Sequence, residues 1–134
     1  MELTSTGANI TSGYLTISNG SLYFGVSGTP LQILSNIDPE YSVALGYQAG
    51  YTNSTGNDNA FFGRVAGYST TSANNTFIGQ GAGYYVSTGA KNTILGCYSG
   101  NQGGLDIRTA SNYIVLSDGD GNPRFVVNGS GAFS

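Results

Sequence analysis

Side chains suited to catalysis are scarce in this sequence. It contains no histidine, so neither a histidine-based catalytic triad nor a histidine-ligated metal site can be built from it. Seven carboxylates remain, and a glycosidase would need two of them across a sugar cleft. Asp118 and Asp120 are the only close pair on a structured loop, and that loop is rich in turn-forming residues. We therefore predict that the chain is not an enzyme and uses no cofactor.

A cation site is the next possibility that the residue types raise. Asp118, Asp120 and Asn122 alternate like the first ligands of a calcium-binding loop. The later acidic ligands are missing, because Pro123 and Arg124 follow and no glutamate lies downstream. The run 118–122 is dense in turn-forming residues. The sequence therefore favours a turn here, with a weak cation site as the alternative.

The elements that must position these side chains come from a repeat. Four copies align on their glycines, and they read SVALGYQAGY (42–51), NAFFGRVAGY (59–68), NTFIGQGAGY (75–84) and NTILGCYSGN (92–101). Successive copies are 16 or 17 residues apart. A unit this short cannot bury an apolar face alone, so the copies must stack on one another. We predict an all-β fold with about four coils of a β-roll or triangular β-prism.

Each copy contains a short strand that ends at its first glycine, and both faces of this strand are apolar. Two positions before the glycine stand Ala44, Phe61, Phe77 and Ile94. One position before it stand Leu45, Phe62, Ile78 and Leu95. Neighbouring side chains of a strand point to opposite faces, and a coil has only one inside. The other row therefore predicts an association surface, and we expect a homotrimer.

The alternation leaves open which row faces the trimer axis. We expect both rows to be buried in the trimer, one inside the coil and the other between protomers. Charge added to the row one position before the glycine should therefore disturb the shared core. We expect replacement of both Phe62 and Ile78 by aspartate to leave aggregated or unassembled chains.

Two further rows predict regular stacking of the coils. An asparagine recurs four positions before the glycine, at Asn59, Asn75 and Asn92, and its amide can hydrogen-bond from coil to coil. A tyrosine recurs five positions after it, at Tyr51, Tyr68 and Tyr84. Aromatic rings in register stack or offset. We interpret the tyrosine row as structural, with a carbohydrate platform as the alternative.

Some side chains lie outside these rows. Tyr85, Tyr98 and Tyr113 are predicted to offer exposed contacts. Cys97 takes the variable place after the glycine, which suggests a partly buried thiol at a rim. An interchain or reactive role for this cysteine is the alternative.

The repeats are flanked by two segments that read as hairpins. Residues 1–40 contain two alternating apolar runs around Asn19-Gly20, which is a strong hairpin signal. The repeats occupy residues 41–104. Within 105–134, the runs 113–116 and 124–127 predict a second hairpin. Alternatively, the run from 112 is a degenerate fifth copy with Asn112 in the asparagine place.

Composition excludes several kinds of partner. The net charge is −3, and the four basic residues are scattered, which argues against nucleic-acid binding. No apolar run is long enough to cross a membrane, so we expect no membrane insertion. Only 8% of the residues are charged, whereas 22 are glycine and ten are tyrosine. Such a composition is typical of a β-protein with many turns.

Two resemblances rest on whole phrases of the sequence. The run SVALGYQA (42–49) and the weaker N-[TA]-x-[FIL]-G of the other copies resemble the head repeats of trimeric autotransporter adhesins. Those repeats form parallel β-rolls packed three abreast. The runs 36–51, 75–83 and 91–125 are similar to tail-fibre and other appendage proteins of tailed phages.

The second resemblance implies a structural role on a virion, outside the cell. It implies a rigid homotrimeric rod or tip for host attachment, with other tail proteins and a host surface glycan or protein as partners. Three alternatives are a bacterial surface adhesin head, a stand-alone carbohydrate-binding module and a filament-forming subunit.

Overall fold

The computed structural model describes residues 41–133, and within this range it is all-β and has no helix. The strands are β1 Val43–Leu45, β2 Ala60–Phe62, β3 Thr76–Ile78, β4 Thr93–Leu95, β5 Asn101–Gln102, β6 Leu105–Asp106, β7 Ile114–Ser117 and β8 Pro123–Val127. The predicted all-β solenoid of about four turns is confirmed. The hairpin predicted in residues 1–40 lies outside the described residues.

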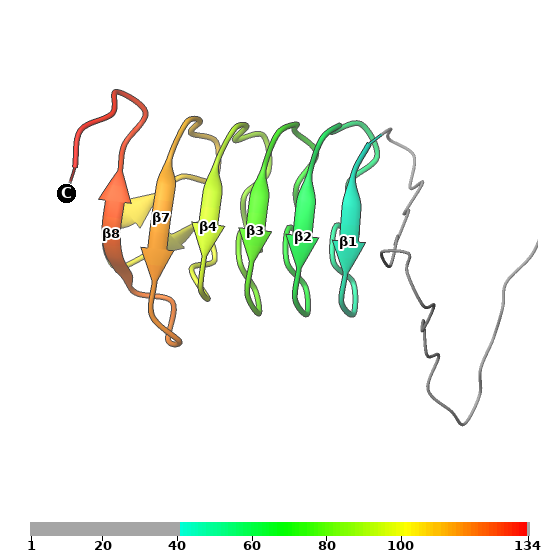
Figure 1. The fold of residues 1–134 in the computed structure, drawn as a ribbon, viewed down its shortest axis with the longest axis horizontal. Coiled ribbons are helices and arrows are strands. Elements are labelled where there is room, and N and C mark those ends of the chain that lie inside the picture. Colours follow the sequence, from blue (N-terminus) through cyan, green and yellow to red (C-terminus); the bar gives the residue numbers. More distant parts are fainter. Residues whose placement is uncertain (1–40, 134) are drawn as a thin grey trace, which may run out of the picture. The chain divides into compact units, whose positions relative to one another are not determined.

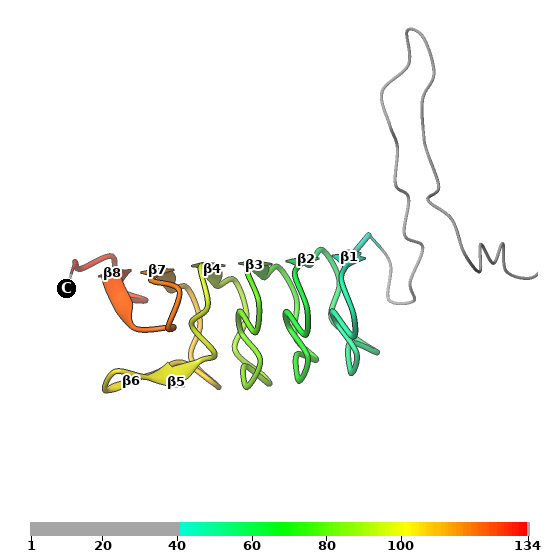
Figure 2. The same ribbon diagram turned by 90° about the horizontal axis from the view of Figure 1, so that it is seen from below.

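One six-stranded sheet runs the length of the solenoid, in the order β1-β2-β3-β4-β7-β8 (Figure 1). Strands β1 to β4 and β7 are parallel, and β8 is antiparallel to β7. Each repeat contributes one strand, and turns carry the chain around the side opposite the sheet (Figure 2). The small β5-β6 hairpin lies on this turn side (Figure 2).

The register of the parallel strands stacks equivalent residues of successive coils. The row that points into the coils consists of Ala44, Phe61, Phe77, Ile94 and Val115. The last four of these side chains are fully buried, and Ala44 packs against them. The phenyl rings of Phe61 and Phe77 stack with their centroids 5.5 Å apart. The inner row is therefore the core of the protomer.

The two glycines of each repeat have different structural roles. The first glycine takes a φ that L side chains rarely adopt, 134° at Gly63 and 138° at Gly79. A Cβ on Gly63 would overlap the carbonyl oxygen of Gly79 in the next coil. In the first three repeats the second glycine is left-handed, and a Cβ on Gly67 would overlap the ring of Phe61. One glycine thus lets the coils approach, and the other makes room for the core.

The asparagine row links the coils through their backbones. The side-chain oxygen of Asn59 accepts the backbone N–H of Asn75 at 2.8 Å, and Asn75 accepts that of Asn92 at 3.0 Å. The amide nitrogens donate to turn carbonyls, for example from Asn59 to Gly56 at 2.8 Å. All three asparagines are buried. Each amide therefore satisfies polar groups that the closed coil hides from water.

Asn75→Ala tests the energetic value of this row. The substitution leaves the buried N–H of Asn92 without its acceptor, so we expect the free energy of unfolding to fall by about 2–3 kcal/mol. Asn57→Ala is the control, because Asn57 is exposed and bonds Asn74 only through its backbone oxygen. It should change stability by less than about 0.5 kcal/mol. Urea denaturation measures both values, and equal losses would contradict the role of the buried amide.

Strand β7 satisfies both interpretations of the C-terminal sequence. It pairs parallel with β4 as a fifth strand of the solenoid, and antiparallel with β8 as a hairpin. The expected position of Asn112 is wrong, however. Tyr113 takes the asparagine place, since its N–H donates to the side-chain oxygen of Asn92 at 2.9 Å. Asn112 has φ 66° and takes the left-handed place that Asp58 and Asn74 fill in earlier coils.

Candidate functional site

The outer face of the large sheet carries a row of exposed apolar side chains. The row consists of Leu45, Phe62, Ile78, Leu95, Leu116 and Phe125, and each side chain is 36–50% exposed. The structure thus assigns the two rows that the alternation left open. The row two before the glycine fills the coil, and the row one before it lies on the protomer's surface.

A second outward row makes this surface continuous. It consists of Val43, Ala60, Thr76, Thr93, Ile114 and Val127. No charged residue occurs in β1 to β4 or in β7. At the C-terminal end, the ring of Phe133 lies against that of Phe125, with centroids 5.7 Å apart. We name these two outward rows the apolar sheet face.

Such a face is unusual on a solitary soluble chain. Fully burying one Leu, Ile or Phe is worth about 1.5–3 kcal/mol, and each large side chain here has a third to a half left to bury. Six of them amount to a few kcal/mol for each protomer. Contiguous apolar patches of this kind usually mark association sites.

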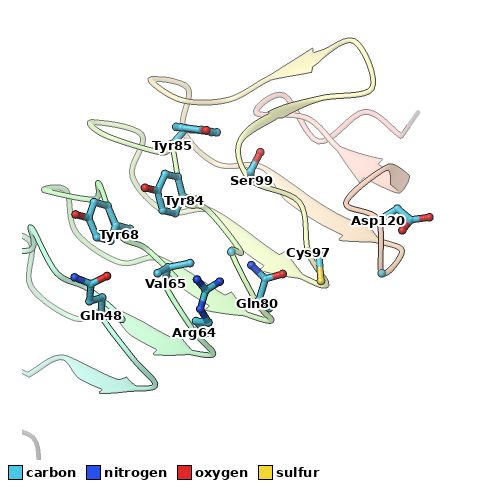
Figure 3. A pocket seen from close by; sticks show the side chains of 12 residues that line it. Gln48, Arg64, Val65, Tyr68, Gln80, Tyr84, Tyr85, Cys97, Ser99 and Asp120 are labelled. Atoms are coloured by element: carbon cyan, nitrogen blue, oxygen red, sulfur yellow. The ribbon is translucent and has the colours of Figure 1, made fainter.

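A different surface lies where the strands end and the chain turns away from the sheet. A groove of about 450 Å³ runs there across successive coils (Figure 3). Its lining consists of Gln48, Arg64, Val65, Tyr68, Gln80, Gly81, Tyr84, Tyr85, Cys97, Ser99, Gly119 and Asp120. The carboxyl ends of parallel strands all meet at one edge, so each coil contributes to the same groove. We name it the tyrosine groove.

Tyr68 and Tyr84 of the tyrosine row line one side of this groove. The ring centroids of Tyr51 and Tyr68 are 5.1 Å apart, and those of Tyr68 and Tyr84 are 4.9 Å apart, with nearly parallel planes. Tyr85 then meets Tyr84 edge to face at 4.7 Å. Figure 3 shows Tyr68, Tyr84 and Tyr85 on one side and Arg64, Gln80 and Cys97 on the other.

The three tyrosines outside the row have different environments. Tyr85 is 54% exposed, as expected for a contact residue. The expectation is wrong for Tyr98, which is fully buried and donates its hydroxyl to the carbonyl oxygen of Leu105 at 2.8 Å. Burial raises the pKa of this hydroxyl, and the nearby Asp106 adds to the effect. Tyr113 is half-buried against the core.

Cys97 lies in the groove as a free, partly buried thiol. It follows the first glycine, as do Tyr47, Arg64 and Gln80, all of which are exposed. The position is therefore a rim at the corner of the coil.

The C-terminal loop positions Asp118 as the anchor of a turn. Its Oδ1 accepts the backbone N–H groups of Asn122 at 2.9 Å and of Asp120 at 3.0 Å. Its Oδ2 accepts Nε of Arg124 at 2.8 Å. Protein donors thus occupy both oxygens, as turn formation requires. Within residues 41–133, no three His, Cys, Asp or Glu side chains are grouped closely enough to hold a metal ion.

These bonds predict a pH dependence of stability. The Asn122 backbone N–H and the Arg124 guanidinium lower the pKa of Asp118 from 3.8 to about 2. The unfolded chain therefore takes up this proton first, so the stabilisation is complete above about pH 4 and is lost as the pH falls towards about 2. We expect the melting temperature of Asp118→Asn to fall less across this range than that of the wild type. Parallel melting curves would contradict the role of Asp118.

Comparisons with protein-family models, curated proteins and solved structures find no match to this chain. No helix among the described residues is long and apolar enough to cross a membrane. Function is therefore argued from the apolar sheet face and the tyrosine groove.

Proposed function

We propose that three copies of this chain assemble side by side through the apolar sheet face and form a stiff rod. The observation that carries the proposal is the outward apolar row that continues through every strand of the sheet. Each protomer already has its own core in the inner row, so the outward row can contact other protomers. Facing copies would remove it from water, and β1 to β4 and β7 contain no charged side chain that would be buried with it.

The regular stacking of the coils supports a mechanical role. Backbone hydrogen bonds join successive coils on the turn side as well as in the sheet, for example from Gly67 to Ala82 at 2.9 Å. The asparagine row adds bonds inside the coils. A solenoid tied in this way resists bending between its repeats.

The biological setting of the proposal comes from the resemblance of the sequence. Its phrases are similar to those of tail fibres of tailed phages, so we place the chain in a virion appendage outside the cell. There the trimeric rod or tip would serve host attachment, joined to other tail proteins. Three identical chains present every contact three times, which strengthens weak binding through avidity.

The mass of the full chain in solution tests the proposal. Light scattering should give three times the chain mass of 13.8 kDa, with or without a glycan in the sample. A single-chain mass at micromolar concentration would overturn the shared face. Long polymers in electron micrographs would favour a filament-forming subunit instead.

A further inference from the structure

We infer that the tyrosine groove binds a linear, polyhydroxylated glycan that lies across the coils. This inference names a ligand for the attachment role proposed above and rests on that role. No residue of the apolar sheet face lines the tyrosine groove. One protomer can therefore assemble through the face and bind a glycan in the groove.

The direction of the groove selects an extended ligand. Its lining begins at Gln48 in the first coil and ends at Asp120, beyond β7 (Figure 3). Equivalent corner positions recur in each coil between these points, as at Arg64 and Gln80. A chain of similar units laid along the groove therefore meets the same backbone corner at every coil, with a different side chain on each.

Polar side chains along the groove can donate hydrogen bonds to a ligand and accept hydrogen bonds from it. Gln48 and Gln80 each carry an amide that donates and accepts, Arg64 donates, and Asp120 accepts. Of the two ion pairs among the described residues, neither involves Arg64 or Asp120. Sugar hydroxyls both donate and accept, so they match this mixture of groups. The single arginine can also take one acidic group of the glycan.

Tyr85 supplies the apolar surface that a sugar ring needs. It is 54% exposed and lies between the tyrosine groove and a second hollow of about 390 Å³. Arg108 lines that hollow, and Asp106 holds its guanidinium with two hydrogen bonds of 3.0 and 2.7 Å. The C–H face of a sugar can rest on the tyrosine ring while its hydroxyls reach the polar groups on either side.

The corner beneath the groove has the same left-handed backbone in three successive coils. Gln48 has φ 52° and Val65 has φ 54°, and Gly81 fills the equivalent place in the next coil with φ 68°. The turn of the repeat therefore sets this conformation, and the groove keeps the same backbone shape from coil to coil.

Other ligand classes fit the groove less well. A nucleic acid requires clustered basic residues, whereas the groove has one arginine and one aspartate. An extended peptide usually pairs with a free sheet edge, and the groove crosses strand ends instead. A small apolar ligand requires a mostly apolar lining, whereas most of the lining side chains here carry polar groups.

The test titrates three fluorescent hexasaccharides into the full chain: neutral cellohexaose, N-acetylated chitohexaose and an acidic hyaluronan hexasaccharide. We expect at least one to bind saturably, and Tyr85→Ala to weaken it by about tenfold or more. Arg64→Gln should weaken binding by about threefold or more, most strongly for the acidic probe. Tyr47→Ala is the matched control, since Tyr47 is 68% exposed but does not line the groove. It should change binding by less than about twofold.

Melting temperatures close to that of the wild type show that each variant is folded. Absence of saturable binding by all three probes would overturn the glycan site, as would equal effects of Tyr85→Ala and Tyr47→Ala. Light scattering on the same samples separates the two proposals. A trimer that binds no glycan overturns only the groove, whereas a single chain that binds glycan overturns only the shared face.

Discussion

Replacing Gly79 by alanine is expected to unfold the solenoid or to lower its free energy of unfolding by about 4 kcal/mol or more. Gly79 has φ 138°, and a Cβ there would overlap the carbonyl oxygen of Gly96 in the next coil. The Cα that would carry the new methyl group and the carbonyl oxygen of Gly96 are both backbone atoms at the ends of the paired strands β3 and β4. No side chain can therefore rotate to make room. The new methyl group must therefore push two coils apart.

Alanine substitutions at two other glycines measure how much of the loss comes from the overlap and how much from the backbone conformation. Gly81 also has positive φ, 68°, but a Cβ there meets nothing within 4 Å. Gly81→Ala should therefore cost only the conformational penalty of about 1–2 kcal/mol. Gly119 has neither feature, and its replacement by alanine should change stability by less than about 1 kcal/mol.

Denaturant unfolding of the three variants, followed by circular dichroism, measures these differences. The expected order of destabilisation is Gly79→Ala, then Gly81→Ala, then Gly119→Ala. If Gly79→Ala lost no more stability than Gly81→Ala, close approach of the coils would not explain the first glycine of the repeat.

The sequence predicts the solenoid because its periodic positions have local causes. The glycine before each corner, the asparagine before β2, β3 and β4 and the paired apolar residues between them recur together. Strand pairing in register follows from this recurrence, and Phe61 pairs with Phe77 as the repeat requires.

The assignment of the inner row needed information that alternation alone lacks. Phe61 and Phe62 are equally apolar, so a period of two cannot distinguish the inside of the coil from the outside. The second glycine carries the missing signal. A Cβ at Gly67 would overlap the ring of Phe61, so this glycine marks the row that needs space inside the coil.

Two predictions that proved wrong, the exposure of Tyr98 and the place of Asn112, have a common physical origin. Tyr98 is buried and Tyr113 replaces an asparagine, because the chain between β4 and β7 contains the additional β5-β6 hairpin. The repeat no longer fixes positions after this insertion. A signal for the correct register was present, since Asn112 tolerates the left-handed conformation that precedes each strand.

The groove could not be predicted from residue types. Its corner positions carry different side chains in each copy, as at Arg64, Gln80 and Cys97, and only the fold shows that they line up. Variable residues on a fixed scaffold are typical of recognition surfaces. The repeat thus fixes the shape of the groove, whereas the variable places set its chemistry.

The proposed trimer predicts that Phe62→Asp combined with Ile78→Asp abolishes assembly. Both side chains lie in the middle of the outward row, 36% and 41% exposed. In the assembled rod, each carboxylate would be removed from water without a partner, which costs far more than the apolar contact contributes. We expect the mass in solution to fall from three chains to one, or the chains to aggregate.

The fold of the separated chain distinguishes this effect from simple unfolding. The inner row, with Phe61 and Phe77, is unchanged by the substitutions, so a soluble variant should keep its β circular dichroism. Its melting temperature should be lower and should no longer rise with protein concentration, because association no longer stabilises it.

A control with the same added charge completes the argument. Asn57→Asp with Thr88→Asp also adds two carboxylates, but at exposed positions outside the apolar sheet face. This variant should keep the trimeric mass and its concentration-dependent melting. If Phe62→Asp with Ile78→Asp remained trimeric as well, the outward row would not be the interface. In that case the apolar side chains of the sheet face would remain in water in the trimer, and a different partner would have to cover them.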